Sequence, residues 1–216
     1  DTNFEVLGFG TDSLGNEVSY AEGYLDEKDD VDVYVINPDT MVSVTASAIT
    51  VYAGDTVDLT IKEQNTGDDP LTGVYVELYK DAALHATLDK DSVGFSGDTN
   101  TNGKLDVGET WQWSVTGITV SADTNFEVLG FGTDSLGNEV SYAEGYLDEK
   151  DDVDVYVIEP DTMVSVTASA MTVYAGDTVD LTITEENTGD DPLTDVYVEL
   201  YKDTVLHTTL DKDSTG

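Results

Sequence analysis

Apolar and polar residues alternate with a period of two along most of the chain, and no segment of ten or more residues shows helical spacing. This alternation is typical of strands with one buried face. Within residues 39–160 it predicts strands around residues 42–46, 57–61, 74–78, 84–88, 111–115, 126–128, 140–142 and 153–157.

Turn-forming residues separate the predicted strands. Tyr52-Ala53-Gly54-Asp55 and Asn65-Thr66-Gly67-Asp68-Asp69-Pro70 are rich in the residues that favour tight turns. Seven or eight short strands in about 120 residues, with one apolar and one polar face, predict an all-β protein built as a β-sandwich.

A long repeat organises the chain. Residues 1–94 return as residues 123–216 with nine differences, which gives a period of 122 residues. Copies this similar indicate a tandem array in which every unit has the same role. A catalytic centre has no need of near-identical copies in series, so the repeat favours a structural or adhesive protein over an enzyme.

Two Pro-Asp segments predict the boundaries of the repeats. Pro38 and Pro160 each follow a strand-like run, and proline cannot continue the interior of a sheet. We therefore expect residues 39–160 to form one complete repeat. Residues 1–38 would be the C-terminal part of a preceding repeat, and residues 161–216 the N-terminal part of a following one. Completion within a longer polypeptide is favoured over strand exchange between subunits.

The charge is strongly negative. The chain has 46 acidic residues, 8 lysines and no arginine, and its formal net charge is −38. Such a charge disfavours binding to nucleic acid or to anionic membrane surfaces. No stretch of 18 apolar residues predicts a membrane span. Two explanations fit the charge, a salt-rich environment and bound divalent cations, and they are compatible with each other.

One loop matches the calcium-loop pattern D-x-[DN]-x-[DN]-G-x5-E over residues 98–109. Ca²⁺ prefers six to eight oxygen ligands, and alternate side chains of a tightly curled loop converge on one point. The sequence therefore predicts a calcium site, although an acidic, turn-rich hairpin loop would have a similar composition. The expected ligands are Asp98, Asn100, Asn102, the backbone carbonyl of Lys104, Asp106 and Glu109.

The same residues carry a resemblance to a known family. Asn65-Thr66-Gly67, the segment from Gly97 to Asp106 and Gly108-Glu109-Thr110-Trp111 resemble the Ig-like tandem repeats of archaeal and bacterial cell-surface proteins, here with a dockerin-like calcium loop. The resemblance covers roughly residues 41–147. It implies an Ig-like sandwich in a cell-surface or secreted protein and implies no enzymatic activity. The acidic segment 144–152 departs from the family pattern.

Other candidate sites are weaker. The acidic run 148–152 could hold a second cation with Asp39 or Asp161, but a solvated charge run is the more common explanation. His85 and His207 occupy the same repeat position without a partner for catalysis. Trp111 and Trp113 are expected in the core, with a sugar-stacking platform as the alternative.

These observations predict a calcium-stabilised Ig-like repeat of an extracellular filament, stalk or surface-layer-associated protein. Its expected partners are neighbouring copies of the same repeat, and a cell-surface glycan is a further candidate partner. An adhesin or carbohydrate-binding module is the alternative, and a noncatalytic spacer of a secreted enzyme is a further one. Exposed threonines leave O-glycosylation open.

Overall fold

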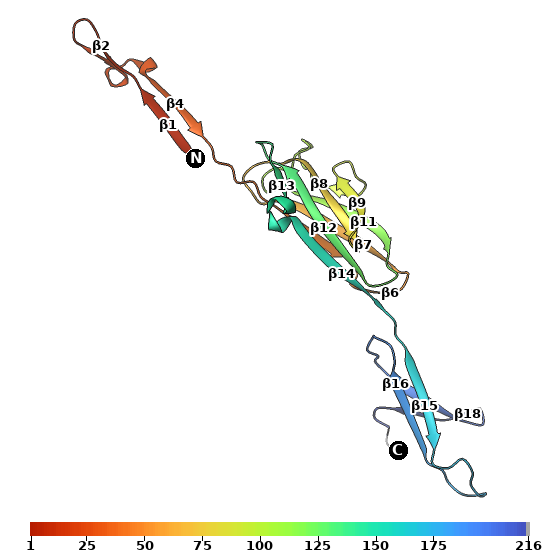
Figure 1. Cartoon of the computed structure of the whole chain (residues 1–216). Helices are drawn as coiled ribbons and strands as arrows, with labels where there is room; N and C mark the ends of the chain where they lie inside the picture. The colour runs from red at the N-terminus through yellow and green to blue at the C-terminus, as the bar shows by residue number, and fades with distance from the viewer. Residues whose placement is uncertain (215–216) are drawn as a thin grey trace.

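The structure, a computed structural model, describes residues 1–214, so the last two residues of the predicted segment 161–216 lie outside the described residues. Strands dominate, and the helices among the described residues are short 3₁₀ turns. None of these helices has the length and apolar character needed to cross a membrane. Figure 1 shows a sandwich in the middle of the chain, with a hairpin at one end and further paired strands at the other.

The central sandwich consists of two sheets. The first has the strand order β10-β11-β7-β5, and the second has the order β6-β14-β12-β8-β9 with β13 paired to β12. The strands are β5 (Thr40–Ala46), β6 (Thr50–Tyr52), β7 (Thr56–Asn65), β8 (Thr72–Lys80), β9 (Ala83–Asp89), β10 (Phe95–Ser96), β11 (Thr110–Thr119), β12 (Thr124–Thr133), β13 (Glu139–Ser141) and β14 (Lys150–Ile158). The 3₁₀ helices η3 (Tyr142–Glu144) and η4 (Leu147–Glu149) precede β14.

The topology is that of an Ig-like sandwich. The first strand of the sandwich, β5, lies in the first sheet. The chain then crosses to the second sheet, where β6 pairs in parallel with β14, the last strand of the sandwich. All other pairings between sandwich strands are antiparallel. The predicted all-β sandwich is confirmed. The sequence pattern did not predict β6 and β10, which are three and two residues long.

The core is formed by the inward-facing half of the alternating residues. In β7 the side chains of Val57, Leu59 and Ile61 are at most 1% exposed. Trp111 and Trp113 are also fully buried and pack against Phe95, with ring centroids 5.1 and 5.7 Å away. The two tryptophans therefore belong to the core, as expected, and do not form an exposed platform for sugars.

Outside the sandwich, each described strand pairs with one other strand of the same terminal part of the chain, and all four pairings are antiparallel. The N-terminal part contains β1 (Thr2–Leu7), β2 (Phe9–Thr11), β3 (Glu17–Ser19), η1 (Tyr20–Glu22), η2 (Leu25–Glu27) and β4 (Lys28–Val33). The C-terminal part contains β15 (Thr162–Ala168), β16 (Leu181–Asn187), β17 (Tyr197–Lys202) and β18 (Val205–Asp211). Val164 and Val166 are 61% and 59% exposed, whereas Val42 and Val44, at the same repeat positions, are 3% and 5% exposed. All sandwich strands lie between residues 40 and 158, and the domain boundaries at 39 and 160 stay a prediction.

This difference in burial predicts losses of stability of very different size at one repeat position. Replacing Leu59, which is 1% exposed, by alanine should lower the free energy of unfolding by about 2–5 kcal/mol, because the substitution leaves a cavity in the core. Leu181→Ala changes the equivalent residue, which is 44% exposed, and should cost less than about 0.5 kcal/mol. Urea unfolding followed by the fluorescence of Trp111 and Trp113 reports on the sandwich alone. Equal losses for the two variants would contradict this assignment of the core.

Candidate metal centre

The predicted calcium loop lies between β10 and β11, and the middle of the loop is bonded to the sandwich. Leu105 is fully buried and forms an isolated bridge with Leu71, with both N–H···O distances at 3.0 Å. Thr101 and Gly103 adopt positive φ angles of 58° and 73°. Glycine accepts this left-handed conformation without strain, and the two residues curl the loop tightly.

The first ligand position organises the start of the loop. The carboxylate of Asp98 accepts hydrogen bonds from the backbone N–H groups of Asn102 at 3.1 Å and Gly103 at 2.9 Å. The carboxylate of Glu109 closes the other end. Its Oε1 accepts from the backbone N–H of Thr99 at 2.8 Å, and its Oε2 accepts from the backbone N–H of Asp106 at 3.1 Å. The loop is therefore held closed by the carboxylates at its two ends.

The remaining ligand positions meet at Asp106. Its Oδ2 accepts from the side-chain amides of Asn100 at 2.7 Å and Asn102 at 2.8 Å. The amide oxygens of these residues accept backbone N–H groups, of Asn102 and Lys104 respectively. The structure thus brings together the side chains of Asn100, Asn102 and Asp106. The carboxylates of Asp98 and Glu109 accept hydrogen bonds from backbone N–H groups at the two ends of the loop, and the ligand expected from Lys104 is its backbone carbonyl. A bound cation would contact the carboxylate of Asp106 in place of these two amide donors.

The donor set fits a hard cation. Carboxylate, amide and carbonyl oxygens suit Ca²⁺, whereas Zn²⁺ prefers nitrogen and sulfur. Within residues 1–214, no three His, Cys, Asp or Glu side chains gather closely enough to hold a metal ion by themselves. A cation in this loop would therefore depend on the oxygens of the asparagines and the backbone as well as on the carboxylates.

Asn65, at the end of β7, connects the loop to the rest of the sandwich. This residue is 1% exposed, and its side-chain amide donates to the carbonyls of Asp69 at 2.8 Å and Leu105 at 3.0 Å. Its backbone N–H donates to the carbonyl of Glu109, and its carbonyl accepts from Gly108. The sequence marked Asn65 only as part of a turn and of the family resemblance. Its connection to the loop was not predicted, because Leu105, Gly108 and Glu109 lie 40 or more residues away.

The same turn also holds the segment that enters the domain. The carbonyl of Asp39 accepts from the backbone N–H groups of Thr66 and Gly67 at 3.0 and 2.9 Å, and Asp68 accepts from the N–H of Asn37 at 2.6 Å. Gly67 lies so close to the backbone of residues 37–39 that a Cβ there would collide with it. The contacts recur at the next joint, between the segment 159–161 and residues 188–190.

The acidic run 148–152 does not surround one point. Asp151 accepts from the N–H of Val44 at 2.9 Å, and Asp152 accepts from the side chain of Asn125 at 2.9 Å on the outer face. Asp148 is exposed. Only Glu149 points into the sandwich, where it is fully buried.

Glu149 meets a second buried carboxyl group, that of Glu63 in β7. Glu63 is 1% exposed, and the two groups lie within hydrogen-bonding reach of each other above Gly130. Burial, followed by the charge of Glu149, raises the pKa of Glu63 well above its usual range. Burial also raises the pKa of Glu149 to about 7, against an opposing effect of the neighbouring Glu63 carboxyl group. Sequence reasoning missed Glu63, although it continues the inward-facing series of Val57, Leu59 and Ile61.

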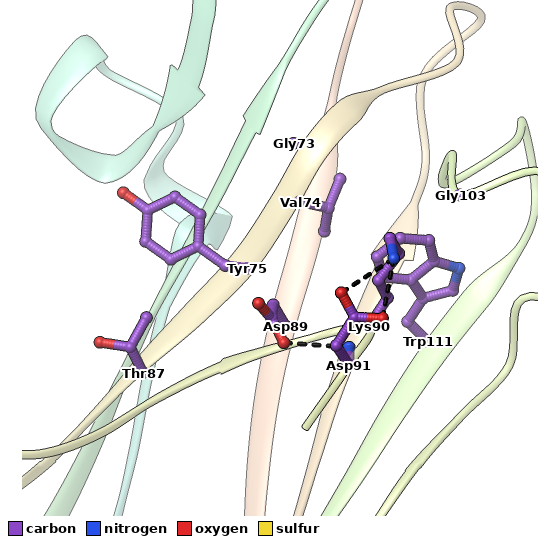
Figure 2. A pocket seen from close by; sticks show the side chains of 9 residues that line it. All are labelled: Gly73, Val74, Tyr75, Thr87, Asp89, Lys90, Asp91, Gly103 and Trp111. Carbon is purple, nitrogen blue, oxygen red and sulfur yellow. Dashed lines mark hydrogen bonds and ion pairs between the residues drawn. The ribbon is translucent and has the colours of Figure 1, made fainter. Parts of the chain in front are cut away.

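A pocket opens beside the loop between β8 and β9 (Figure 2). Figure 2 shows Tyr75 and Thr87 on one side and Lys90, Asp91 and Trp111 on the other. The Nζ atom of Lys90 contacts both carboxylate oxygens of Asp91, at 2.8 and 3.0 Å. The indole Nε1 of Trp111 is buried and has no hydrogen-bond partner in the described part of the chain. The remaining lining residues are Gly73, Val74, Asp89 and Gly103.

Comparisons with known proteins give structural likenesses only. No known protein family matches the chain, and no curated protein sequence does. A solution structure of the CARDB domain of a Pyrococcus furiosus protein is 14% identical, with a TM-score of 0.41, over 56% of this chain and 94% of that one. A crystal structure of this CARDB domain in complex with di-metal ions is 15% identical, with a TM-score of 0.42, over 58% and 97%.

The buried carboxyl pair predicts a dependence of stability on pH. With divalent cations chelated, the melting temperature should rise as the pH falls from about 8 to 5.5. Because the pKa values of both groups are higher in the folded state, the folded chain retains protons that the unfolded chain releases. The resulting stabilisation is complete below the unfolded pKa, near 4.5, and is lost as the pH rises through the folded values.

The matched control separates the pair from the general charge of the chain. Glu63→Gln/Glu149→Gln should flatten the pH profile, whereas Glu17→Gln/Glu144→Gln, which removes two exposed carboxyl groups, should preserve it. The same slope in both double variants would assign the pH dependence to surface repulsion instead of the pair.

Proposed function

We propose that the chain is a calcium-stabilised Ig-like tandem repeat of an extracellular or cell-surface filament, stalk or surface-layer-associated protein. Its partners are neighbouring copies of the same repeat, and the role of these 216 residues involves neither nucleic acid nor insertion into a membrane. The proposal rests most directly on the loop 98–109, which is closed by Asp98 and Glu109 and joined through Asn65 to the turn that holds the linker.

Calcium in this loop would act on the joint between repeats. The loop contacts Asn65, and the turn that begins at Asn65 receives the backbone of Asp39 and Asn37. A cation that rigidifies the loop therefore also favours the turn geometry that fixes the linker. Neutralising local carboxylates is a second contribution, because the chain carries a net charge of −38. An array of such joints would resist bending, which suits a filament or a stalk.

The proposed role includes no catalysis. His85 and His207 are both exposed on strands and occupy equivalent positions in two repeats. General acid–base or nucleophilic catalysis needs a second group within hydrogen-bonding distance, and neither histidine forms a side-chain hydrogen bond with another residue of the described part.

Calcium should raise the stability of the sandwich. A ligand that binds only the folded state adds about 2.7 kcal/mol to the free energy of unfolding at a hundredfold excess over its Kd. Glu109→Gln removes one carboxylate charge from the loop and should abolish the loop's share of this gain. Glu144→Gln makes the same charge change at an exposed residue and should retain the full gain.

Thermal unfolding in chelator and in millimolar calcium measures both effects. An identical melting temperature of the unmodified chain under the two conditions would contradict the proposal.

Glycan binding is the second candidate, and the pocket of Figure 2 is the observation that favours it. Aromatic faces combined with a few polar groups are typical of carbohydrate sites. Tyr75 lines the pocket and stacks on Phe131, with nearly parallel rings 4.7 Å apart, and Thr87 and Asp89 add polar groups to the lining. Titration with cell-surface polysaccharides, followed by tryptophan fluorescence, tests this role. A response that survives Tyr75→Ala would assign binding to another surface.

A further inference from the structure

The pair of Glu63 and Glu149 leaves three buried oxygen atoms without a partner. Oε2 of Glu63 and both carboxyl oxygens of Glu149 accept no hydrogen bond within residues 1–214. The side chains are 1% and 0% exposed, so water does not solvate them. Buried carboxylates without partners are strongly unfavourable, and such groups are normally paired or bound to a metal ion.

No basic side chain of the described part neutralises the pair. The ion pairs of residues 1–214 involve Lys28, Lys90, Lys150 and Lys212, and none of them includes Glu63 or Glu149. Lys150 follows Glu149 directly but points to Glu127 on the outer face. The other charged groups that act on Glu149 are Asp39 and Asp148, and both are acidic. The electrostatic field at the pair therefore attracts a cation.

The local structure leaves room for the two carboxyl groups to converge. A Cβ at Gly130 would collide with Oε2 of Glu149 and Oε2 of Glu63, so both oxygens lie above the same backbone position in β12. Thr40, which is 1% exposed, lies close enough to Glu63 to oppose the rise of its pKa, and its hydroxyl adds a further oxygen. In the N-terminal part, Glu27 covers Gly8 as Glu149 covers Gly130, but no second carboxyl group of the described residues lies as close there.

Charge and the number of open oxygens indicate a divalent cation. One shared proton would use two of the three open oxygens and would leave one negative charge in the core. A divalent cation can contact all three oxygens and balances both carboxylates. We propose that Glu63 and Glu149, assisted by the hydroxyl of Thr40, form a second and buried site for a hard divalent cation such as Ca²⁺ in each complete repeat.

This site would add to the calcium loop and does not depend on it. Glu63 and Asn65 both belong to β7, two residues apart, so the two sites lie at the same end of the domain, next to the linker. The acidic run 148–152 would then contribute one ligand, Glu149, and its other carboxylates would remain on the surface or at the edge of the sheet.

Counting bound calcium ions tests the proposal on the full 216-residue chain. Equilibrium dialysis at high salt suppresses weak attraction to surface carboxylates. The unmodified chain should bind two ions, because it holds one loop and one complete pair. Glu109→Gln should retain one ion, at the pair, and Glu63→Gln/Glu149→Gln should retain one, at the loop. The control Glu17→Gln/Glu144→Gln, which removes two exposed carboxyl groups, should bind two.

The outcomes distinguish the two sites. If Glu109→Gln binds no calcium, the buried site is refuted, and this result does not require the double variant to fold. If the loop alone fails, the unmodified chain and Glu109→Gln each bind one ion and the double variant binds none. Two ions bound to a folded Glu63→Gln/Glu149→Gln chain would also refute the proposal, and circular dichroism establishes that this variant is folded. A pair that binds no calcium but shows the pH dependence described above holds protons instead.

Discussion

The hydrogen bonds of Asn65 are the interaction on which the organisation of this repeat depends. One buried amide links the end of β7, the carbonyl of Asp69 in the turn and the carbonyl of Leu105 in the calcium loop. The backbone of the same residue is bonded to Gly108 and Glu109. The turn that starts here receives the linker through Thr66 and Gly67. Loop, sandwich and joint are thus connected within a few residues, and a change in the loop can reach the joint without a large movement.

The negative charge of the chain favours the binding of cations. The chain has 46 acidic residues and only 8 lysines. In sheets stabilised by apolar packing alone, the repulsion between these carboxylates would not be offset. Some carboxylates are used within the structure, as when Asp134 accepts N–H groups of Leu136 and Asn138 and its pKa is lowered, first by the side chain of Asn138. The loop carboxylates also accept hydrogen bonds but form no ion pair within the described residues, and three oxygens of the buried pair have no partner there. Two cations at one end of each domain would offset repulsion where successive repeats meet.

The sequence predicted the fold well because a half-buried strand records its environment at every second residue. Val57, Leu59 and Ile61 show the pattern, and all three are in the core. The candidate ligands of the loop could be named because a local motif places them within twelve residues, and their role as ligands stays a prediction. The partnership of Glu63 with Glu149 could not be predicted, because it joins positions 86 residues apart. An acidic residue on the apolar face of β7 was the available signal, and it gains meaning only when the partner is known.

The direction of side chains within the loop also lay beyond the sequence. The motif predicts that the amide oxygens of Asn100 and Asn102 face the cation, whereas the structure turns their amide nitrogens toward Asp106. Either orientation satisfies the same residue types, so the pattern alone cannot choose between them. The amide oxygen would face a bound cation, whereas the amide nitrogen donates to a carboxylate at the same place.

Hydrogen–deuterium exchange, read at single amides with and without calcium, tests the coupling of loop and joint most directly. The account predicts that calcium slows exchange of Gly103 in the loop and also of Thr66 and Gly67, whose N–H groups hold Asp39. Thr188 and Gly189 make the same bonds to Asp161, but these 216 residues contain no second copy of the loop, so their exchange should not change. Protection confined to residues 98–109, with Thr66 and Gly67 unaffected, would contradict the account.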